Sequence, residues 1–265
     1  MKIATWNINS VRLRLNLVTR FLRQQQPDVL CLQETKVIND LFPAKRLREL
    51  GYVHQAINGQ KGYHGVAILS RLPFVRNEAR SFCGKDDCRH MAVTFESGLE
   101  LHNFYVPAGG DVPDPEVNPK FAHKLDFLRE LSACFESRPD RQTPVVLVGD
   151  LNVAPLPSDV WSHKQLLNVV SHTPVEVDLL HAAKAAFDWI DLTREFIPHD
   201  QKVYSWWSYR AQNWEASDRG RRLDQIWISQ GLKGAAKYHA ILKPLRGWKR
   251  ASDHVPVVAE FDLST

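Results

Sequence analysis

Cysteine is scarce in this sequence and is not placed as a disulfide framework or a zinc site requires. The 265 residues include four cysteines, of which Cys31 and Cys134 sit in apolar runs typical of buried thiols. Cys83 and Cys88 flank Gly-Lys-Asp-Asp, but no second Cys or His pair completes a zinc pattern. We therefore expect free thiols in a reduced, cytoplasmic protein.

Long hydrophobic runs and flexible linkers are also missing. No stretch approaches the ~20 apolar residues that span a bilayer. Met1-Lys2-Ile3 leads into a short strand-like run rather than into a signal peptide. No Ser/Gly-rich or low-complexity tract divides the chain, and 44% of its residues are hydrophobic and 24% charged. We expect one globular domain over residues 1–265 that has no membrane partner and works as a monomer.

Positive charge is concentrated in the last quarter of the chain. Residues 201–265 hold 11 Lys and Arg against 6 Asp and Glu, whereas the whole chain has a net charge of +4. The same stretch holds five of the eight tryptophans, namely Trp206, Trp207, Trp214, Trp227 and Trp248. Basic charge beside exposed rings suits a polyanion whose bases or sugars stack, and the alternative is a solvated basic face over core tryptophans. We favour the core for Trp227, inside the alternating run Leu223–Ile228, but not for Trp206 or Trp207.

Hydrophobic periodicity predicts an α/β fold. Runs with strand character are Lys2–Ile8, Asp28–Gln33, Tyr52–Ile57, Gly65–Ser70, Met91–Phe95, Leu99–Val106, Val145–Asp150, Arg222–Ser229, Tyr238–Leu242 and Val255–Phe261. Helical spacing is found at Arg12–Gln25, Ala44–Leu50, Pro119–Phe135 and Pro174–Trp189. Loops are expected at Pro107–Pro119, Ala154–Ser162 and Ala211–Gly220. Strand-rich halves with helices outside predict two facing sheets in an α/β sandwich.

Four short polar clusters lie at or beside the ends of strand-like runs. They are Trp6–Asn9, Gln33–Thr35, Gly149–Asn152 and Ser252–His254. Because strand side chains alternate between faces, we expect Asn7 and Asn9 to point the same way, and likewise Asp150 and Asn152. Carboxylates, amides and an imidazole that converge at sheet ends make a hard-oxygen site for Mg²⁺ or Mn²⁺ and a phosphate.

Each polar position also has a purely structural interpretation. Glu34 follows an apolar run and could simply meet solvent, while Gly149–Asn152 could be a β-turn with Asx capping. Tyr105 closes a strand just before a Gly-Gly loop, where a tyrosine often only packs. Four clusters spread over residues 6–254 nevertheless favour one shared site between two halves of the domain.

The last cluster offers an imidazole with two candidate acidic neighbours. Asp253 and His254 point to opposite sides of an extended chain, so Asp253 could serve a metal while His254 meets a phosphate. Asp224 interrupts a strand pattern, and a buried Asp needs a partner, for which His254 is a candidate. Such a pair would favour the imidazolium, which stabilises a pentacovalent phosphate. The alternative is a structural pairing of Asp224 with Arg221 or Arg222.

These residues, in this order, closely resemble the exonuclease III family of abasic-site endonucleases, within the endonuclease/exonuclease/phosphatase superfamily. The resemblance covers essentially the whole length and is highly specific. The matching segments are Thr5–Arg12, Leu32–Lys36, Asn103–Pro107, Gly149–Asn152, Tyr204–Trp207, Arg222–Asp224 and Ser252–His254. The resemblance implies a four-layered α/β sandwich and a Mg²⁺-dependent phosphodiesterase, with Mn²⁺ as a substitute. The expected partner is duplex DNA with abasic sites or damaged 3′ ends, in base-excision repair.

The resemblance also implies roles for individual residues. Glu34 would be the principal metal ligand, and the other residues around metal and phosphate would be Asn7, Asp150, Asn152, Asp253 and His254. Asp150 would orient or deprotonate the attacking water with help from Asn152. Tyr105 would sit beside the phosphate, and Asp224 would orient His254.

DNA contacts are expected from a second group of residues. By the resemblance, Trp206 and Leu223 would line an apolar pocket for a flipped-out abasic sugar. Asn9 is a further candidate for DNA binding. Lys249 and Arg250, in the basic last quarter, would hold phosphates without reading sequence.

Two departures from the family pattern bear on substrate choice. Ala108 stands where many members carry an amide, and Ser208 stands where an Asp commonly follows the aromatic pair. The alternative function is a dedicated 3′–5′ exonuclease with weak abasic activity. A lipid or inositol phosphodiesterase fits poorly with the basic, Trp-rich end of the chain. A catalytically inactive DNA-binding module would require a missing ligand or base, and every expected position is filled.

Overall fold

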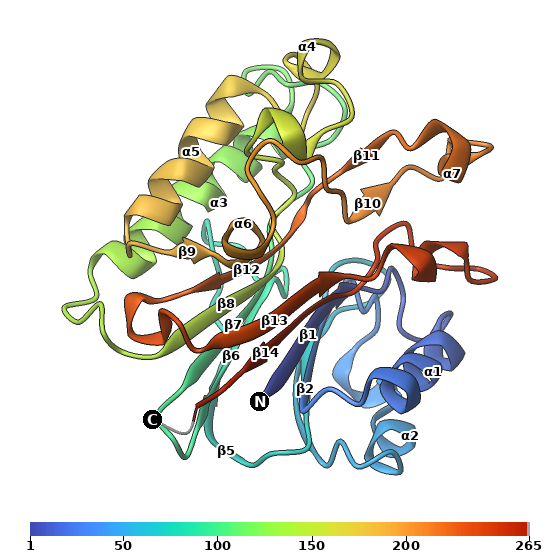
Figure 1. Cartoon of the computed structure of the whole chain (residues 1–265), viewed down its shortest axis with the longest axis vertical. Helices are drawn as coiled ribbons and strands as arrows, with labels where there is room; N and C mark the ends of the chain where they lie inside the picture. Colours follow the sequence, from blue (N-terminus) through green and yellow to red (C-terminus); the bar gives the residue numbers. More distant parts are fainter. Residues whose placement is uncertain (264–265) are drawn as a thin grey trace.

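The computed structural model describes residues 1–263, and two six-stranded sheets face each other at its centre (Figure 1). The first sheet has the order β13 (Ala236–Ile241), β14 (Val257–Phe261), β1 (Lys2–Asn7), β2 (Val29–Gln33), β4 (Val66–Ser70) and β3 (His54–Asn58). The second has the order β5 (Phe74–Glu78), β6 (His90–Phe95), β7 (Glu100–Tyr105), β8 (Val145–Asp150), β12 (Asp224–Ile228) and β9 (Ile190–Asp191). A small third sheet pairs β10 (Trp206–Trp207) with β11 (Gly220–Arg221).

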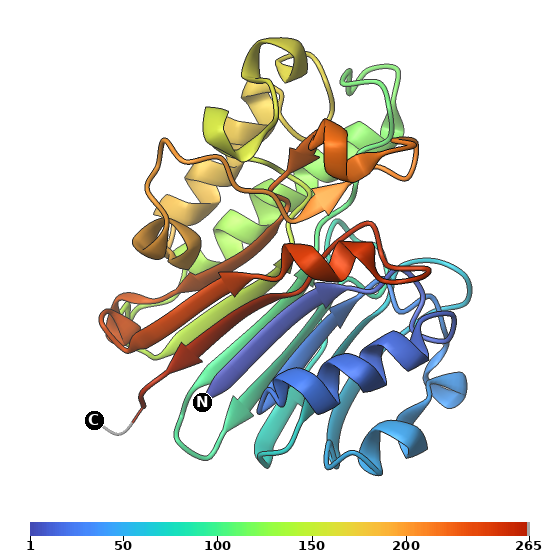
Figure 2. The ribbon, with the colours of Figure 1, turned by 45° about the vertical axis from the view of Figure 1, so that its right-hand side comes forward.

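Helices cover the outer face of each sheet. Beside the first sheet lie α1 (Leu15–Gln25) and α2 (Ala44–Arg48), and beside the second lie α3 (Pro119–Glu136) and α5 (Pro174–Ala185) (Figures 1 and 2). Shorter helices are α4 (His163–Leu166), α6 (Leu192–Phe196) and α7 (Trp214–Ser217), with 3-10 turns at Asn39–Leu41, Pro157–Asp159, Gln230–Leu232 and Lys243–Gly247. The predicted four-layered sandwich of two mixed sheets with helices outside is confirmed. Among residues 1–263 no helix combines the length and apolarity needed to cross a bilayer.

Strand β8 shows why the central runs are so apolar. All six of its residues are buried, because both faces of the second sheet are covered. Val146 and Val148 join the core between the sheets, whereas Val145 and Leu147 join the cluster that packs under α3 and α5. Alternation therefore persists along the strand, but it separates two apolar environments rather than core from solvent.

Strand direction gathers the polar clusters at one end of the sandwich. β1 and β2 are parallel, with Asn7 opposite Gln33, and β7 and β8 are parallel, with Tyr105 opposite Asp150. β12 runs antiparallel to β8, so Asp224 at its start lies opposite Asp150. Polar residues that end separate strands are thus brought to a common edge.

Some predicted elements differ from the observed ones. β5 was not predicted, because three of its five residues are exposed and it forms an edge of the sheet. The predicted strand Arg222–Ser229 begins only at Asp224, and the predicted loop Ala211–Gly220 contains α7. Trp227 is buried as expected, but Trp207 is also buried, against Tyr204 and Val255, which corrects the interpretation of Trp207 as outside the core.

Gly149 is required by the close approach of β7 and β8. Its φ is 143°, and a Cβ there would lie 1.9 Å from the carbonyl oxygen of Phe104. We expect Gly149→Ala to lower the free energy of unfolding by about 2 kcal/mol or more, because the backbone of β7 or β8 would have to move to make room for the added Cβ. Gly247→Ala, where nothing lies within 4 Å of the added atom, is the control. Equal midpoints for both variants in urea unfolding would contradict this account.

Candidate active site

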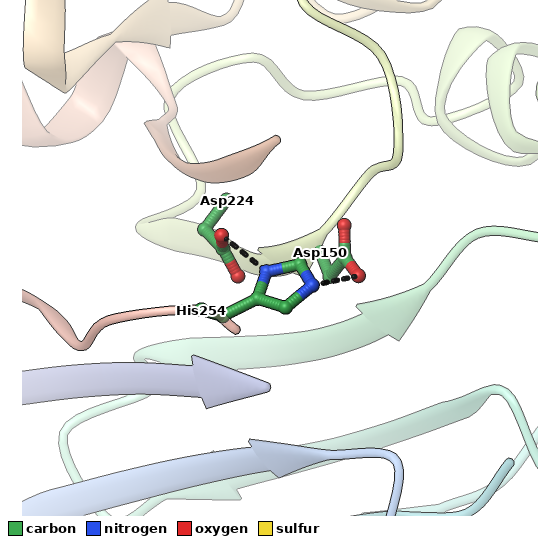
Figure 3. A group of neighbouring side chains, drawn as sticks. All are labelled: Asp150, Asp224 and His254. Carbon is green, nitrogen blue, oxygen red and sulfur yellow. Dashed lines mark hydrogen bonds and ion pairs between the residues drawn. The ribbon is translucent and has the colours of Figure 1, made fainter. Parts of the chain in front are cut away.

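An imidazole held between two carboxylates forms the centre of the site (Figure 3). His254 Nδ1 lies 2.8 Å from Asp224 Oδ2, and His254 Nε2 lies 3.6 Å from Asp150 Oδ2. All three side chains are buried. Burial alone would lower the pKa of His254, but the carboxylates of Asp224 and Asp150 raise it to about 10. The ring is therefore an imidazolium at neutral pH.

Asp224 is placed by β12 and by a serine that sequence reasoning missed. Ser205 Oγ donates to Asp224 Oδ2 at 2.6 Å and accepts from the Asp224 backbone N–H at 3.0 Å. The structure pairs Asp224 with His254 rather than with a neighbouring arginine. Arg222 points away and binds Asp159 and Asp191. The only sequence signal for Ser205 is its place just before Trp206, within a matching segment.

Asn7 connects the two sheets within the site. Its buried amide nitrogen donates to Glu34 Oε1 at 2.9 Å and to Asp150 Oδ2 at 2.8 Å. Ser252 Oγ in turn donates to the Asn7 carbonyl at 2.7 Å. One amide group therefore fixes the separation of two carboxylates that belong to different sheets.

Glu34 lies just beyond β2, with a left-handed backbone of φ 51° that turns its side chain into the site. Its Oε2 is 2.7 Å from Lys36 Nζ, which also donates to Asn9 Oδ1 at 2.7 Å. Burial opposes ionisation, but the Lys36 ammonium and the Asn7 amide hold the pKa of Glu34 below its usual value. Lys36 was not predicted as a site residue, although it closes the matching segment Leu32–Lys36.

Asp150 and Asn152 lie together, but not by strand alternation. β8 ends at Asp150, and Asn152 has a left-handed backbone with φ 53°. The Asn152 backbone N–H donates to Asp150 Oδ1 at 3.0 Å, and its side-chain amide donates to Asp150 Oδ2 at 3.2 Å. Asn9, with φ 47°, likewise lies beyond the end of β1. Both pairs do reach one site, as predicted, but left-handed turns at Asn9 and Asn152 bring them there rather than strand alternation.

Asp253 faces away from His254, as an extended chain requires. It accepts from Asn9 Nδ2 at 3.1 Å on one oxygen and from Trp206 Nε1 at 3.0 Å on the other. Burial raises its pKa, but the charge of His254 and these two donors hold the pKa below its usual value. Asp253 is thus an anion that links the acidic site to Trp206 in β10.

Tyr105 lines the same edge, opposite Asp150 in the β7–β8 ladder. Burial first, and then the charges of Glu34 and Asp150, raise the pKa of Tyr105 well above its usual value, so its hydroxyl keeps its proton. The Arg89 guanidinium lies 4.9 Å from the centre of the Tyr105 ring. Tyr105 is therefore available as a neutral hydrogen-bond donor.

Of the five predicted DNA-binding residues, Asn9 lies in the acidic site, where it donates to Asp253, and the other four fall into two places. Leu223 and the partly buried Trp206 belong to one apolar cluster, which also contains Val160. Lys249 and Arg250 lie on the exposed segment after the 3-10 turn Lys243–Gly247. The structure brings Trp206 against the acidic site through Asp253. Arg250 is tied to the margin of the site through its backbone, because Arg14 donates to the carbonyl oxygens of both Arg250 and Asn9.

A divalent cation fits the oxygen side of this site. Asp150, Asp224 and His254 are the one set of at least three acidic, His or Cys groups within residues 1–263 whose ligand atoms lie within 4.8 Å of one another. An imidazolium bonded to Asp224 has no free lone pair on that nitrogen, so this trio is a poor metal cage. Glu34 and Asp150 instead share a single neutral donor, the Asn7 amide. A hard cation beside these two carboxylates would neutralise their remaining negative charge.

Known proteins match almost the whole chain. The model of the Endonuclease/Exonuclease/phosphatase family matches residues 4–254. Exodeoxyribonuclease III of Haemophilus influenzae is 30% identical, over 98% of this chain and 100% of its own length. Two solved structures are 31% identical in sequence to this chain, and each match covers 99% of this chain and 100% of the other protein's chain. They are an AP endonuclease from Archaeoglobus fulgidus, with a TM-score of 0.91, and the 3′-5′ exonuclease NExo from Neisseria meningitidis, with 0.90.

The site geometry predicts that Glu34→Gln weakens cation binding. Removing this charge should raise the dissociation constant of Mn²⁺ at least tenfold, because one anionic oxygen ligand is lost. Electron paramagnetic resonance of free Mn²⁺ measures the constant directly. Glu49→Gln, in an exposed ion pair with Arg46, is the matched control. Unchanged Mn²⁺ affinity in Glu34→Gln would remove Glu34 from the ligand set.

Proposed function

The chain belongs to the endonuclease/exonuclease/phosphatase family, and on that premise we propose a Mg²⁺-dependent nuclease that cleaves duplex DNA 5′ to abasic sites and processes damaged 3′ ends. The chain is a hydrolase of phosphodiester bonds, similar to exodeoxyribonuclease III and AP endonucleases. The main observation behind this proposal is the His254 imidazolium, which lies between Asp224 and Asp150 and opposite the Asn7–Glu34 pair. This arrangement offers a cation, a candidate base and an oxygen-rich metal site around one phosphate.

Nucleases of this family depend on a divalent metal, and the donor set described above fits one. Glu34 would hold it, with Asn7 and Asp150 beside it and Asp253 and Asn152 at the margins of the site. When bound, the metal neutralises charge that develops on the phosphate and on the leaving 3′-oxygen. Mg²⁺ is the proposed ion, with Mn²⁺ as a substitute, because the ligands are oxygens.

Asp150 is the proposed general base. Burial raises its pKa to about 7, against the opposing charge of His254, and a base with a pKa near the working pH transfers protons most effectively. The two Asn152 donors orient its carboxylate. Asp150 would take the proton of a water that attacks phosphorus in line with the 3′-oxygen.

His254 and Tyr105 are proposed to hold the phosphate. The imidazolium, fixed by Asp224, presents its Nε2 to the site and stabilises negative charge on the pentacovalent phosphate. The Tyr105 hydroxyl donates to a phosphate oxygen from β7. Neither residue has to change protonation state to do this, because the pKa of each is raised.

The alternative, a dedicated 3′–5′ exonuclease, has one specific argument in its favour. The solved structures to which this chain is similar at 31% identity include both an AP endonuclease and a 3′-5′ exonuclease, with TM-scores of 0.91 and 0.90. One assay separates the two functions. Purified protein in Mg²⁺ is given a duplex with a single tetrahydrofuran abasic analogue and the same duplex with a recessed 3′ end. Activity in EDTA equal to that in Mg²⁺ would remove the metal mechanism altogether.

The assignment of Asp150 and His254 predicts a loss confined to turnover. Asp150→Asn and His254→Ala should each lower kcat on the tetrahydrofuran duplex by roughly 100-fold or more, the scale of general-base or transition-state contacts. Affinity for the uncleaved duplex, measured by fluorescence anisotropy in EDTA, should change far less. Equal losses in binding and turnover would indicate a structural role.

The different chemistry of Trp206, in an apolar cluster, and of the exposed Lys249 and Arg250 predicts different effects on specificity and on affinity. Trp206→Ala should reduce discrimination between abasic and intact duplexes, because the apolar wall contacts only a flipped residue. Replacing Lys249 and Arg250 with Ala should weaken binding to every duplex and lower the log–log salt slope by up to about two. Binding titrations at several salt concentrations measure both. An unchanged abasic-to-intact ratio in Trp206→Ala would place Trp206 outside the pocket.

A further inference from the structure

One buried lysine reaches the backbone of both loops that border the proposed base. Lys124, on α3, is fully buried, and its ammonium donates to the Asn152 carbonyl at 2.7 Å and to the Ala108 carbonyl at 3.3 Å. The loop at Asn152 follows β8, and the loop at Ala108 follows β7. Because burying an ammonium is costly, its place behind these two loops needs a reason.

Glu176, on α5, compensates the charge of Lys124. The two side chains form an ion pair in which neither is exposed to solvent. The same carboxylate accepts from the backbone N–H groups of Ser171 at 2.9 Å and of Thr173 at 3.1 Å, and from the Thr173 hydroxyl at 2.6 Å. Glu176 is thus held by the segment that leads into its own helix, which gives Lys124 a fixed anchor between α3 and α5.

The contact with Asn152 connects Lys124 to Asp150. Asn152 has a left-handed backbone, and it turns two donors onto Asp150: its backbone N–H, 3.0 Å from Oδ1, and its side-chain amide, 3.2 Å from Oδ2. A left-handed backbone at a residue other than glycine persists only where surrounding contacts hold it, and the ammonium binds the carbonyl of this same residue. Burial lowers the pKa of Lys124, and the charges of Glu176 and Asp150 oppose this shift, so the ammonium also lies within the field of Asp150.

We propose that Lys124 is a positioning residue for the reaction, which holds Asn152 in the conformation that orients the Asp150 carboxylate toward the attacking water. This inference rests on the proposed function of Asp150 as general base and adds the contact that aligns it. Lys124 acts through the Asn152 backbone rather than through the substrate. Glu176 supplies the anchor and the compensating charge, so both members of the pair can be replaced without removing a reacting group.

The test separates positioning from charge compensation. Lys124→Met removes the donors but leaves Glu176 as an isolated buried charge, so this single variant also loses stability. The double variant Lys124→Met/Glu176→Gln removes both charges and keeps side chains of similar size, and it should melt closer to the wild type than Lys124→Met does. Its kcat on the tetrahydrofuran duplex in Mg²⁺ should nevertheless be about 10- to 100-fold below the wild-type value, the scale of a small misplacement of a reacting group. KM should stay within about threefold of the wild-type value, because the contacts with substrate are intact.

A double-mutant cycle with Asn152 tests the route of the effect. Asn152→Ala removes the side-chain donor to Asp150 and, with it, much of the orientation that Lys124 maintains. In this background the Lys124→Met/Glu176→Gln substitutions should lower kcat by no more than about threefold further, because residues that act through one contact are not additive. A structural effect elsewhere in the fold would multiply with the loss caused by Asn152→Ala.

Leu131→Ala is the matched control for stability. Leu131 is buried on the same helix, about two turns beyond Lys124, and packs in the apolar cluster under α3 and α5. The cavity that this substitution leaves should lower the melting temperature, as Lys124→Met does, while kcat stays within about twofold of the wild-type value. Lys124→Leu/Glu176→Gln replaces the double variant if that variant fails to fold in a thermal melt.

The kinetic outcomes decide the proposal. A loss of kcat that persists in the folded double variant and disappears in the Asn152→Ala background supports it. Recovery of kcat together with stability in the double variant overturns it, because Lys124 would then serve only to compensate Glu176. A further loss of about tenfold or more in the Asn152→Ala background, or an equal loss of kcat in Leu131→Ala, overturns it as well.

Hydrogen exchange gives a readout that does not depend on activity. The Asn152 backbone amide, which donates to Asp150, should exchange about tenfold faster or more in the double variant than in the wild-type protein. An unchanged exchange rate overturns the proposal. If the wild-type protein cleaves no duplex in Mg²⁺, the proposed function fails, and this exchange rate still decides whether Lys124 holds Asn152 against Asp150.

Discussion

One amide group, that of Asn7, holds together the two halves of the site. It donates to Glu34 at the end of the first sheet and to Asp150 at the end of the second. These donors are effective only if the sheets keep their separation, which the core between them enforces through residues such as Ile3 and Val148. Close-packed interiors resist small shifts, so the core sets the distance between the carboxylates. The geometry of the site is therefore a property of the whole sandwich.

Charge compensation explains which ionisable groups this fold tolerates in its interior. His254 is kept cationic by Asp224 and Asp150, and Lys124 is buried against Glu176. Breaking such a pair leaves an isolated buried charge, at a cost of about 3–5 kcal/mol. On the opposite side of His254, Glu34 has only a partly exposed lysine as counter-charge. This weaker compensation of Glu34 lies where a cation and a phosphate are proposed to meet.

Sequence patterns pointed to residues that the fold brings together, because polar residues at the ends of apolar strands stand out in the sequence. Asp150 and Asp224 were singled out in this way, and the antiparallel pairing of β8 with β12 explains why they meet. The sequence pattern did not reveal Ser205, because a serine beside aromatic residues does not indicate its partner. Ser205 meets Asp224 only in the folded chain, where β10 pairs with β11. Nor could the pattern reveal the partner of Arg222, since Asp159 lies 63 positions away in the chain. Backbone conformation was equally hidden: Asn9 and Asn152 reach the site through left-handed turns, not through alternation.

The replacement of an amide by Ala108 need not loosen the loop that follows β7. Lys124 Nζ donates to the Ala108 carbonyl at 3.3 Å and to the Asn152 carbonyl at 2.7 Å, so both loops are held from behind through their backbones. Gly109 lets this lysine approach, because a Cβ there would lie 2.9 Å from Lys124 Cδ. The lysine thus fixes the loop itself through backbone carbonyls, whatever side chain stands at position 108. The placement of Asn152 beside Asp150 is therefore independent of the side chain at position 108.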